Sequence, residues 1–280
     1  MYHIQQNLFN MELLDFLNKI NLQQTIANRI CLLIDLNKKE YEKYILDLLD
    51  NQKAEETYEL LSKKYESDQE NLNILAIYLL TCLKTYDLYL KKGINEEIFI
   101  DTMKCFTRFI DECKITDNKT YFDRPWWTYR QTSMSLFRIL QLEYELDYKT
   151  KSISIHVPSD AILSINNVKD SIIKAKEFFK KYYKDFKDEF YISSWLLSPN
   201  LKKHLQENSN ILNFQKFFEL ISFNENDNSC LLWLFNSKET TDYNLLKEDT
   251  SLQRSIKKDL IEGYKIGSGF AKLKNISSRR

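Results

Sequence analysis

Apolar residues recur at helical spacing through the first part of the chain, from Leu8 to about Cys113. A period of about 3.6 residues is typical of helices that bury one face. This part contains one glycine and no proline, the two residues that most often interrupt a helix. The segment from Leu72 to Leu90 is apolar on almost every side, so we expect it at the centre of a helical bundle. The spacing predicts helices over residues 9–19, 23–35, 38–50, 53–66, 71–91 and 96–113.

The pattern changes near residue 120, where an aromatic-rich stretch begins. Asp123 can cap a helix that carries Pro125 in its first turn. These residues predict a junction helix over about 123–137.

Two segments after the junction alternate between apolar and polar residues, at 140–146 and at 152–157. A period of two residues is typical of a strand with one buried face. The two segments are therefore predicted strands, joined by a turn at 149–151 and ended by Pro158. The rest of the pattern predicts a helix at 168–182, a strand at 189–197, short helices after Pro199 and Ser209, a hairpin of 217–224 with 229–236, and a helix at 250–262 that Gly263 ends, with a further strand possible after it.

This order of elements predicts the α+β class. We expect an all-helical N-terminal domain at residues 1–120 and a mixed β-sheet domain flanked by helices at residues 121–280. The chain length of 280 residues, about twice that of an ordinary domain, agrees with two units.

Composition narrows the classes of function. The 40 basic and 40 acidic residues cancel, so the electrostatic pattern of a protein that binds nucleic acid is missing. No apolar run approaches the roughly 20 residues of a membrane span, which argues against a membrane partner. The N-terminus lacks the features of a secretory signal, which favours a cytoplasmic location. Five cysteines without a close pair are read as reduced thiols, and no spacing indicates a metal site.

Local strings in the second part carry a resemblance to a known family. They are Phe122-Asp-Arg-Pro-Trp-Trp-Thr-Tyr-Arg-Gln131, Leu136-Phe-Arg138, Leu142-Glu-Tyr-Glu145, Ile155-His-Val-Pro-Ser159, Ser194-Trp-Leu-Leu-Ser-Pro199, Asn210-Ile-Leu-Asn-Phe-Gln215 and Asp249-Thr-Ser-Leu-Gln-Arg254. Together they resemble bacterial acyltransferases that join an N-terminal acyltransferase-associated helical domain to a GNAT-like C-terminal domain. The resemblance covers residues 121–271 well and the helical half only loosely, and it implies a GNAT-like sheet and an activity of the acyl-transfer class. Acetyl-CoA or a longer acyl-CoA as co-substrate and an amine as acceptor are the corresponding hypothesis.

Two features depart from the wider GNAT pattern. The signature Asn-x-x-Ala-x-x-Phe/Leu-Tyr-x-x-x-Gly-Phe is best matched at 211–223, with Phe218 at the tyrosine position that protonates the departing thiolate in many GNAT enzymes. The loop that would hold the pyrophosphate, at 157–164, contains no glycine. Phosphates would then need other donors, for which the candidates are Lys169, Lys174 or the glycines Gly267 and Gly269.

His156 is the candidate catalytic base, because it lies on the polar side of a predicted strand beside the expected cleft. Its alternative role is that of a hydrogen-bonded strand histidine. Ser193, Ser194 and Trp195 lie on the strand expected to separate from its neighbour, so they are candidates for cofactor binding together with Gly267 and Gly269. The competing interpretations are a core position for Trp195 and a turn for the glycines.

Trp127, Arg130 and Gln131 are candidates for binding the acceptor, since they offer stacking surface and hydrogen-bond donors. Equally, the same residues can hold the two domains together. His3 and His204 are interpreted as surface residues, and Cys230 as a strand thiol without a basic partner.

Three hypotheses of function remain open at this point. The first is an acyl-CoA-dependent N-acyltransferase that transfers the acyl group directly to an amine, for which the two strands at 152–157 and 189–197 must diverge. The second is a catalytically inactive GNAT-like module that binds a small ligand or a protein partner, for which Trp195 and its neighbours fill that space. The third makes the helical half a partner-binding surface, which requires an exposed apolar groove.

Overall fold

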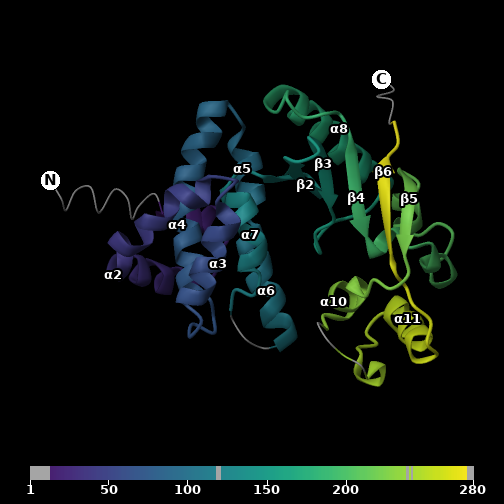
Figure 1. The fold of residues 1–280 in the computed structure, drawn as a ribbon. Helices are drawn as coiled ribbons and strands as arrows, with labels where there is room; N and C mark the ends of the chain where they lie inside the picture. The colour runs from purple at the N-terminus through teal and green to yellow at the C-terminus, as the bar shows by residue number, and fades with distance from the viewer. Residues whose placement is uncertain (1–12, 118–120, 238–239, 241, 276–280) are drawn as a thin grey trace. The chain divides into compact units, whose positions relative to one another are not determined.

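The structure is a computed structural model that describes residues 13–117, 121–237, 240 and 242–275, without the side chains of 114–117 (Figure 1). The chain divides into two compact units, Met1–Arg138 and Ile139–Arg280. The first unit is helical and the second contains most of a six-stranded sheet. This confirms the predicted α+β class, with a helical N-terminal region followed by a mixed sheet.

The first unit is built around α4 (Leu72–Lys92), which packs against α2, α5 and α7. Side chains on all sides of α4 are buried, from Leu72 and Ile74 to Tyr89, so its predicted central position is confirmed. Gly93 ends the helix with a left-handed φ of 67°. The other helices of this unit are a segment at 13–19, α2 (Gln24–Leu49), α3 (Ala54–Lys64), α5 (Glu96–Met103), α6 (Cys105–Asp117) and α7 (Pro125–Thr132).

Two predicted helix boundaries in this unit are wrong. The predicted helices at 23–35 and 38–50 form one continuous helix, α2. The polar residues between them are helical too, and Asn37 Nδ2 donates to Leu33 O at 3.0 Å. The predicted helix at 96–113 is instead two helices that separate at Lys104. Before the break, Thr102 Oγ1 donates to Ile98 O at 2.6 Å, a contact that is known to bend helices.

The junction helix α7 is shorter than predicted. It begins at Pro125 with Arg124, not Asp123, as its N-terminal cap, and it ends at Thr132. Met134 follows with a left-handed φ of 56°, which stops the helix, and residues 136–139 form strand β1 (Leu136–Ile139). The aromatic stretch therefore lies in a short helix of the first unit.

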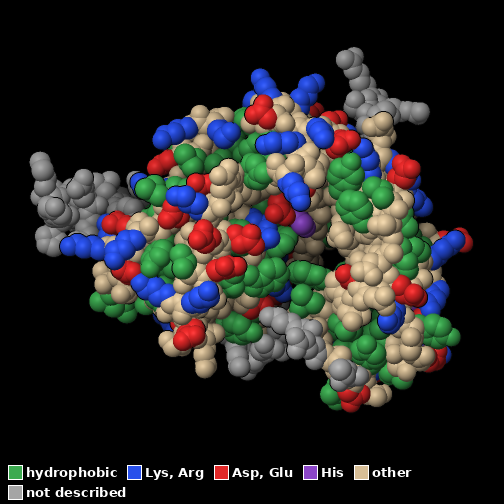
Figure 2. Space-filling view, viewed as in Figure 1, with side chains coloured by type: hydrophobic (Ala, Val, Ile, Leu, Met, Phe, Trp, Pro, Cys, Tyr) green, Lys and Arg blue, Asp and Glu red, His purple; other side chains and the backbone are tan. Residues whose placement is uncertain are grey.

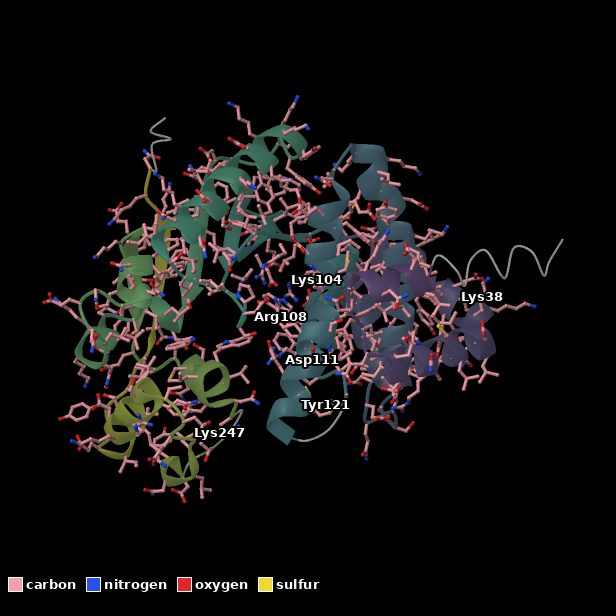
Figure 3. All side chains as sticks on the ribbon, turned by 180° about the vertical axis from the view of Figure 1, so that it is seen from behind. Lys38, Lys104, Arg108, Asp111, Tyr121 and Lys247 are labelled. Carbon is pink, nitrogen blue, oxygen red and sulfur yellow. The ribbon has the colours of Figure 1, made fainter. Side chains whose placement is uncertain are left out.

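Charged residues lie on α6 and immediately before it. Figure 3 labels Lys104 at the break between α5 and α6, and Arg108 and Asp111 on α6. Asp111 Oδ1 accepts from Gln23 Nε2 at 2.7 Å, and the neighbouring Glu112 forms an ion pair with Arg124. These contacts link α6 to the residues before α2 and before α7.

The sheet has the strand order β1-β2-β3-β4-β6-β5. The pairs β2 with β3, β4 with β6, and β5 with β6 are antiparallel, whereas β3 and β4 are parallel. The predicted strands at 140–146 and 152–157 and the turn between them are confirmed. The strands are β2 (Leu142–Asp147), β3 (Ser152–His156), β4 (Phe190–Ser194), β5 (Phe218–Asn224) and β6 (Ser268–Leu273).

Helix α8 (Ile165–Tyr182) supplies the core beneath the central strands. Ser164 caps it by accepting from Asn167 N at 3.4 Å. Its buried stripe includes Ser171 and Phe179, and the Ser171 hydroxyl lies 2.9 Å from the hydroxyl of Tyr144 on β2. Since Tyr144 is fully buried, burial raises the pKa of its hydroxyl above the ordinary value.

The predicted hairpin of 217–224 with 229–236 is wrong in its second half. Residues 229–235 form helix α10 (Ser229–Phe235). The sequence pattern could not distinguish the two, because a short apolar run fits either a helix or a strand. Asp227 Oδ1 accepts from Ser229 N at 2.8 Å and so favours the helical start. The partner of β5 is β6, which enters between β4 and β5 from the end of the chain.

The second unit has a further apolar cluster built from short helices after β4. Its members include Trp195, Leu201, Phe235 and Ile256. A capping box of Thr250 with Gln253 starts the last helix, as the sequence predicts for its first turn. The elements that contribute are η1 (Trp195–Leu197), η2 (Pro199–His204), α9 (Asn210–Gln215), α10, η3 (Tyr243–Leu245) and α11 (Ser251–Ile261).

Basic and acidic side chains are interspersed over the face shown in Figure 2, which agrees with the balanced composition. Within the ranges that the structure describes, no helix is long and apolar enough to cross a membrane. In the same ranges, no group of three or more His, Cys, Asp or Glu residues is placed to hold a metal ion.

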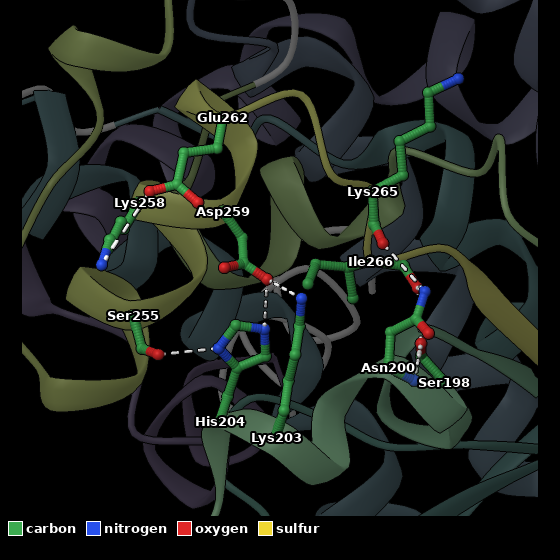
Figure 4. A network of polar contacts seen from close by, with 10 residues as sticks. All are labelled: Ser198, Asn200, Lys203, His204, Ser255, Lys258, Asp259, Glu262, Lys265 and Ile266. Atoms are coloured by element: carbon green, nitrogen blue, oxygen red, sulfur yellow. Dashed lines mark hydrogen bonds and ion pairs between the residues drawn. The ribbon is translucent and has the colours of Figure 1, made fainter.

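The interpretation of His204 as a surface residue is wrong, because its side chain is only 2% exposed. Its Nδ1 lies 2.7 Å from the Ser255 hydroxyl on α11 (Figure 4). Its Nε2 lies 3.1 Å from Oδ2 of Asp259, although the two groups are not aligned for a hydrogen bond, and Asp259 also pairs with Lys203. His204 therefore links η2 to α11.

We expect acidification to weaken this link. Burial lowers the pKa of His204, an effect that the Asp259 carboxylate opposes and the Lys203 ammonium reinforces. Since the unfolded value is about 6.5, the unfolded state binds the proton first, and the contribution to stability is present above that pH and is lost as the pH falls through the folded pKa. Urea denaturation of the wild type and of His204→Asn at about pH 7.5 and 5.5 measures this. The wild type should lose more stability on acidification than the variant, and equal losses would contradict the assignment.

Candidate functional site

Strands β3 and β4 separate along their length. Their register partners are Ile153 with Phe190 and Ser154 with Tyr191, and Ile153 N donates to Glu189 O at 2.9 Å at this end. Beyond these positions, in the part of the sheet that the structure describes, β3 continues to pair with β2 and β4 continues to pair with β6. The two central strands therefore lose each other as partners while each keeps its outer neighbour.

This divergence places His156 and Ser193 on the same face of the sheet. Each lies two residues beyond the last register pair, Ser154 with Tyr191, and side chains two residues apart on a strand share a face. Ser193 is exposed and His156 is partly exposed. The structure thus brings the predicted base and one predicted cofactor-binding residue to the two sides of the separating strands.

An aromatic pair borders Ser193 on that face. Phe270 of β6 is the register partner of Ser193 and stacks on Tyr191, with ring centroids 5.7 Å apart and an interplanar angle of 10°. Lys272 pairs with Glu189 at 2.7 Å on the same part of the sheet and holds the pKa of that carboxyl below its usual range. The face therefore combines an apolar platform with neutralised charges.

Ser194 and Gly269 are register partners on β4 and β6, so two more predicted residues lie beside Ser193. Gly269 has no room for a side chain, because a Cβ atom there would lie 2.7 Å from the carbonyl oxygen of Leu197. Gly267 has a left-handed φ of 73°, and a Cβ atom there would lie 2.6 Å from the carbonyl oxygen of Asn224. Close backbone approach therefore accounts for both glycines.

Trp195 follows β4 but does not continue it. The predicted strand at 189–197 ends at Ser194, and Trp195 begins the turn η1 with 9% of its surface exposed. Its ring belongs to the apolar cluster of the short helices, against which Val157 and Leu163 also pack. In this structure Trp195 has the surroundings of a core residue.

The structure shows where the two departures from the GNAT pattern, Phe218 and the glycine-free loop 157–164, lie in the fold. Phe218 begins β5, is buried, and its ring lies 4.9 Å from that of Phe214 between centroids. The glycine-free loop 157–164 leads directly into α8, with Lys169 in the second turn of that helix and Lys174 exposed further along it. The order of strand, loop and helix is thus kept although the glycines are missing.

The predicted acceptor-binding residues all lie on α7. The Arg130 guanidinium lies over the Trp127 ring, 4.6 Å from its centroid, and over the Tyr129 ring at the same distance. Gln131 is fully buried, and its side-chain amide faces the carbonyl oxygens of Thr128 and Trp127, which fits an assignment of the amide nitrogen to that side at 3.2 Å from both. Gln131 therefore presents no surface to a ligand, whereas Trp127 and Arg130 are partly exposed.

The prediction that Cys230 lies on a strand is wrong, because this residue lies in helix α10. Burial raises the pKa of its thiol to about 11, so little of the reactive thiolate is present at neutral pH. His3 lies outside the described residues.

Among solved structures, the chain is similar to an acyltransferase in complex with decanoyl-CoA and teicoplanin. The two share 20% sequence identity, the match covers 93% of this chain and 87% of the other, and the TM-score is 0.75. A mutant acyltransferase in complex with octanoyl-CoA matches with 19% identity, coverage of 94% and 88%, and a TM-score of 0.75. At these identities the likeness shows a common fold. No curated protein matches the chain.

The sequence itself supports a family assignment. The family model described as GNAT-like C-terminal domain matches residues 51–271. The match confirms the resemblance seen in the local strings and extends it into the helical half. Because the model spans most of the chain, the chain belongs to the family of proteins with a GNAT-like C-terminal domain.

Proposed function

We propose that the protein is an acyl-CoA-dependent N-acyltransferase that transfers an acyl group directly from a CoA thioester to an amine. The observation that carries this proposal is the divergence of β3 and β4 after Ser154 and Tyr191. Strands that part in mid-sheet leave backbone donors and acceptors on their facing edges, and such groups need partners. The amide groups of a pantetheine arm are suitable partners, in the manner of an added strand.

The chemistry of the surrounding residues fits such an arm. Ser193 offers a hydroxyl, and the Tyr191–Phe270 stack offers an apolar surface beside it. Backbone N–H groups of the strands can donate hydrogen bonds to the thioester carbonyl oxygen, where negative charge develops during attack. Two solved structures with a similar fold hold decanoyl-CoA and octanoyl-CoA, which supports a CoA thioester as the substrate class.

His156 acts as the base in this proposal. The amine nitrogen attacks the thioester carbonyl carbon, its N–H proton passes to the imidazole, and the C–S bond breaks to release the CoA thiolate. No covalent enzyme intermediate is needed, because orientation of two bound substrates supplies much of the acceleration. Phe218 cannot protonate the thiolate, so the proton for this group comes from water or from the protonated His156.

The first test is binding of acyl-CoA. We expect acetyl-CoA or a longer acyl-CoA, up to decanoyl-CoA, to raise the thermal stability of the protein, by about 2.7 kcal/mol at a concentration 100-fold above the Kd. A thermal-shift series over chain length, followed by calorimetry, measures this. ATP and free decanoate serve as controls for phosphate binding and for binding of the chain alone. The absence of binding to every CoA thioester would remove the proposal.

A second candidate has an observation in its favour. Trp195 packs into the apolar cluster after β4, and Val157 from the end of β3 packs against the same cluster, which suits a GNAT-like module that binds a ligand without catalysis. Phe218 agrees with this alternative. Binding of acyl-CoA without transfer to any amine in a panel of acceptors would favour the inactive module over the enzyme.

A further inference from the structure

Glu145 and His156 form a side-chain pair on the polar face of the β2–β3 hairpin. Oε2 of Glu145 lies 2.8 Å from Nε2 of His156, and their side chains are 24% and 28% exposed. The register sets Glu145 opposite Ser154 and Glu143 opposite His156, so the contact runs diagonally between the strands. Partial burial keeps this contact from being fully screened by water.

The contact determines which nitrogen of the ring can accept a proton. A carboxylate only accepts hydrogen bonds, so in a neutral ring the proton lies on Nε2 and points to Glu145. The lone pair is then on Nδ1. Carboxylates that hold one ring nitrogen in this way orient the imidazole and raise the basicity of the other nitrogen.

We propose that Glu145 is a positioning residue that holds His156 in the tautomer whose Nδ1 accepts the proton of the attacking amine. This inference rests on the proposed acyltransferase function. In the transfer step the amine N–H bond breaks and the proton binds Nδ1, while the Nε2 proton stays on the ring and Glu145 stays ionised. The carboxylate then lies against the imidazolium and stabilises its charge.

The register partner of His156 on β2 is Glu143, a second carboxylate, which is buried. The diverging part of β4 consists of the uncharged residues Ile192, Ser193 and Ser194. Among the three carboxylates of β2, Glu143, Glu145 and Asp147, the Glu145 carboxylate lies 2.8 Å from the Nε2 atom.

Glu145→Gln tests the inference, with Asp188→Asn as the matched control. Asp188 is an exposed carboxylate of the same unit that pairs with Lys176 at 3.2 Å. We expect Glu145→Gln to lower kcat/KM about 10–100-fold and to leave the Kd for acyl-CoA unchanged. The control should change neither of these. In the His156→Ala background, Glu145→Gln should have no further effect on rate, because the two residues act as a unit.

A second measurement does not depend on activity. The chain has three histidines, so the ring nitrogens of His156 can be assigned by nitrogen NMR after substitution of each. The wild type should show the Nε2–H tautomer, and Glu145→Gln should show a mixture. An Nδ1–H tautomer in the wild type would overturn this inference alone. So would a wild type that transfers acyl groups together with a Glu145→Gln variant of the same kcat/KM. A wild type that neither binds nor transfers an acyl group would overturn the proposed function and the catalytic role of Glu145 with it.

Discussion

Replacing His156 by alanine is expected to lower kcat for acyl transfer about 10²–10⁴-fold, the usual contribution of a general base. The amine must lose a proton as it attacks, and alanine offers no acceptor at this position. Binding of acyl-CoA should persist, because the proposed contacts of the arm are with the strand backbone, Ser193 and the Tyr191–Phe270 stack. Steady-state kinetics with a saturating acceptor, together with calorimetry of acyl-CoA binding, measure the two effects separately.

Ser154→Ala is the matched control for His156→Ala. Ser154 lies two residues earlier on the same strand and face, at the last register position shared with Tyr191. Its substitution removes a polar group from the face without removing a base, so kcat should change little. Equal losses in both variants would indicate that the face is sensitive to any change, and an unchanged kcat in His156→Ala would exclude His156 as the base.

Replacing Trp195 by alanine is expected to destabilise the second unit by about 3–5 kcal/mol, the usual cost of truncating a buried tryptophan. The ring is 9% exposed and belongs to the cluster that includes Leu201 and Ile256, so its removal leaves a cavity among the short helices. Urea denaturation followed by circular dichroism measures the change in the free energy of unfolding.

Trp233→Ala provides the comparison, since Trp233 lies on α10 in the same unit and is 49% exposed. It should cost far less stability than Trp195→Ala. The opposite interpretation of Trp195, as the lining of an acyl channel, predicts a small loss of stability and a change in preference for acyl-chain length. Such a result would indicate that Trp195 lines the ligand site.

Much of the fold could be predicted from periodicity because the patterns were long or strict. The apolar surround of α4 and the alternation of β2 and β3 each admit one reading, and both are confirmed. The segment 229–235 could not be assigned in this way, since seven apolar-rich residues fit a helix and a strand equally well. The strand that pairs with β5 is β6, which lies 44 residues further along the chain (from Asn224 to Ser268), and pairing over that distance leaves no local signal.

The site was predictable in part. Strand order and the resemblance indicated where two strands diverge, and His156 and Ser193 lie on either side of that divergence. Glu145 was missed although a signal was present: two strands joined by a four-residue turn set Glu143 opposite His156 and thus Glu145 diagonal to it. The burial of His204 and Gln131 had no signal of this kind, because it depends on how η2, α11 and α7 pack.

The position of β6 affects the order in which the protein can complete its structure during synthesis. This strand lies between β4 and β5, yet it is the last of the six strands in the sequence. A nascent chain that has not yet reached Ser268 therefore holds β5 without a neighbour and β4 with an open side. Removal of residues 268–273 would delete not an edge but an interior strand, and would separate the remaining strands into two pieces.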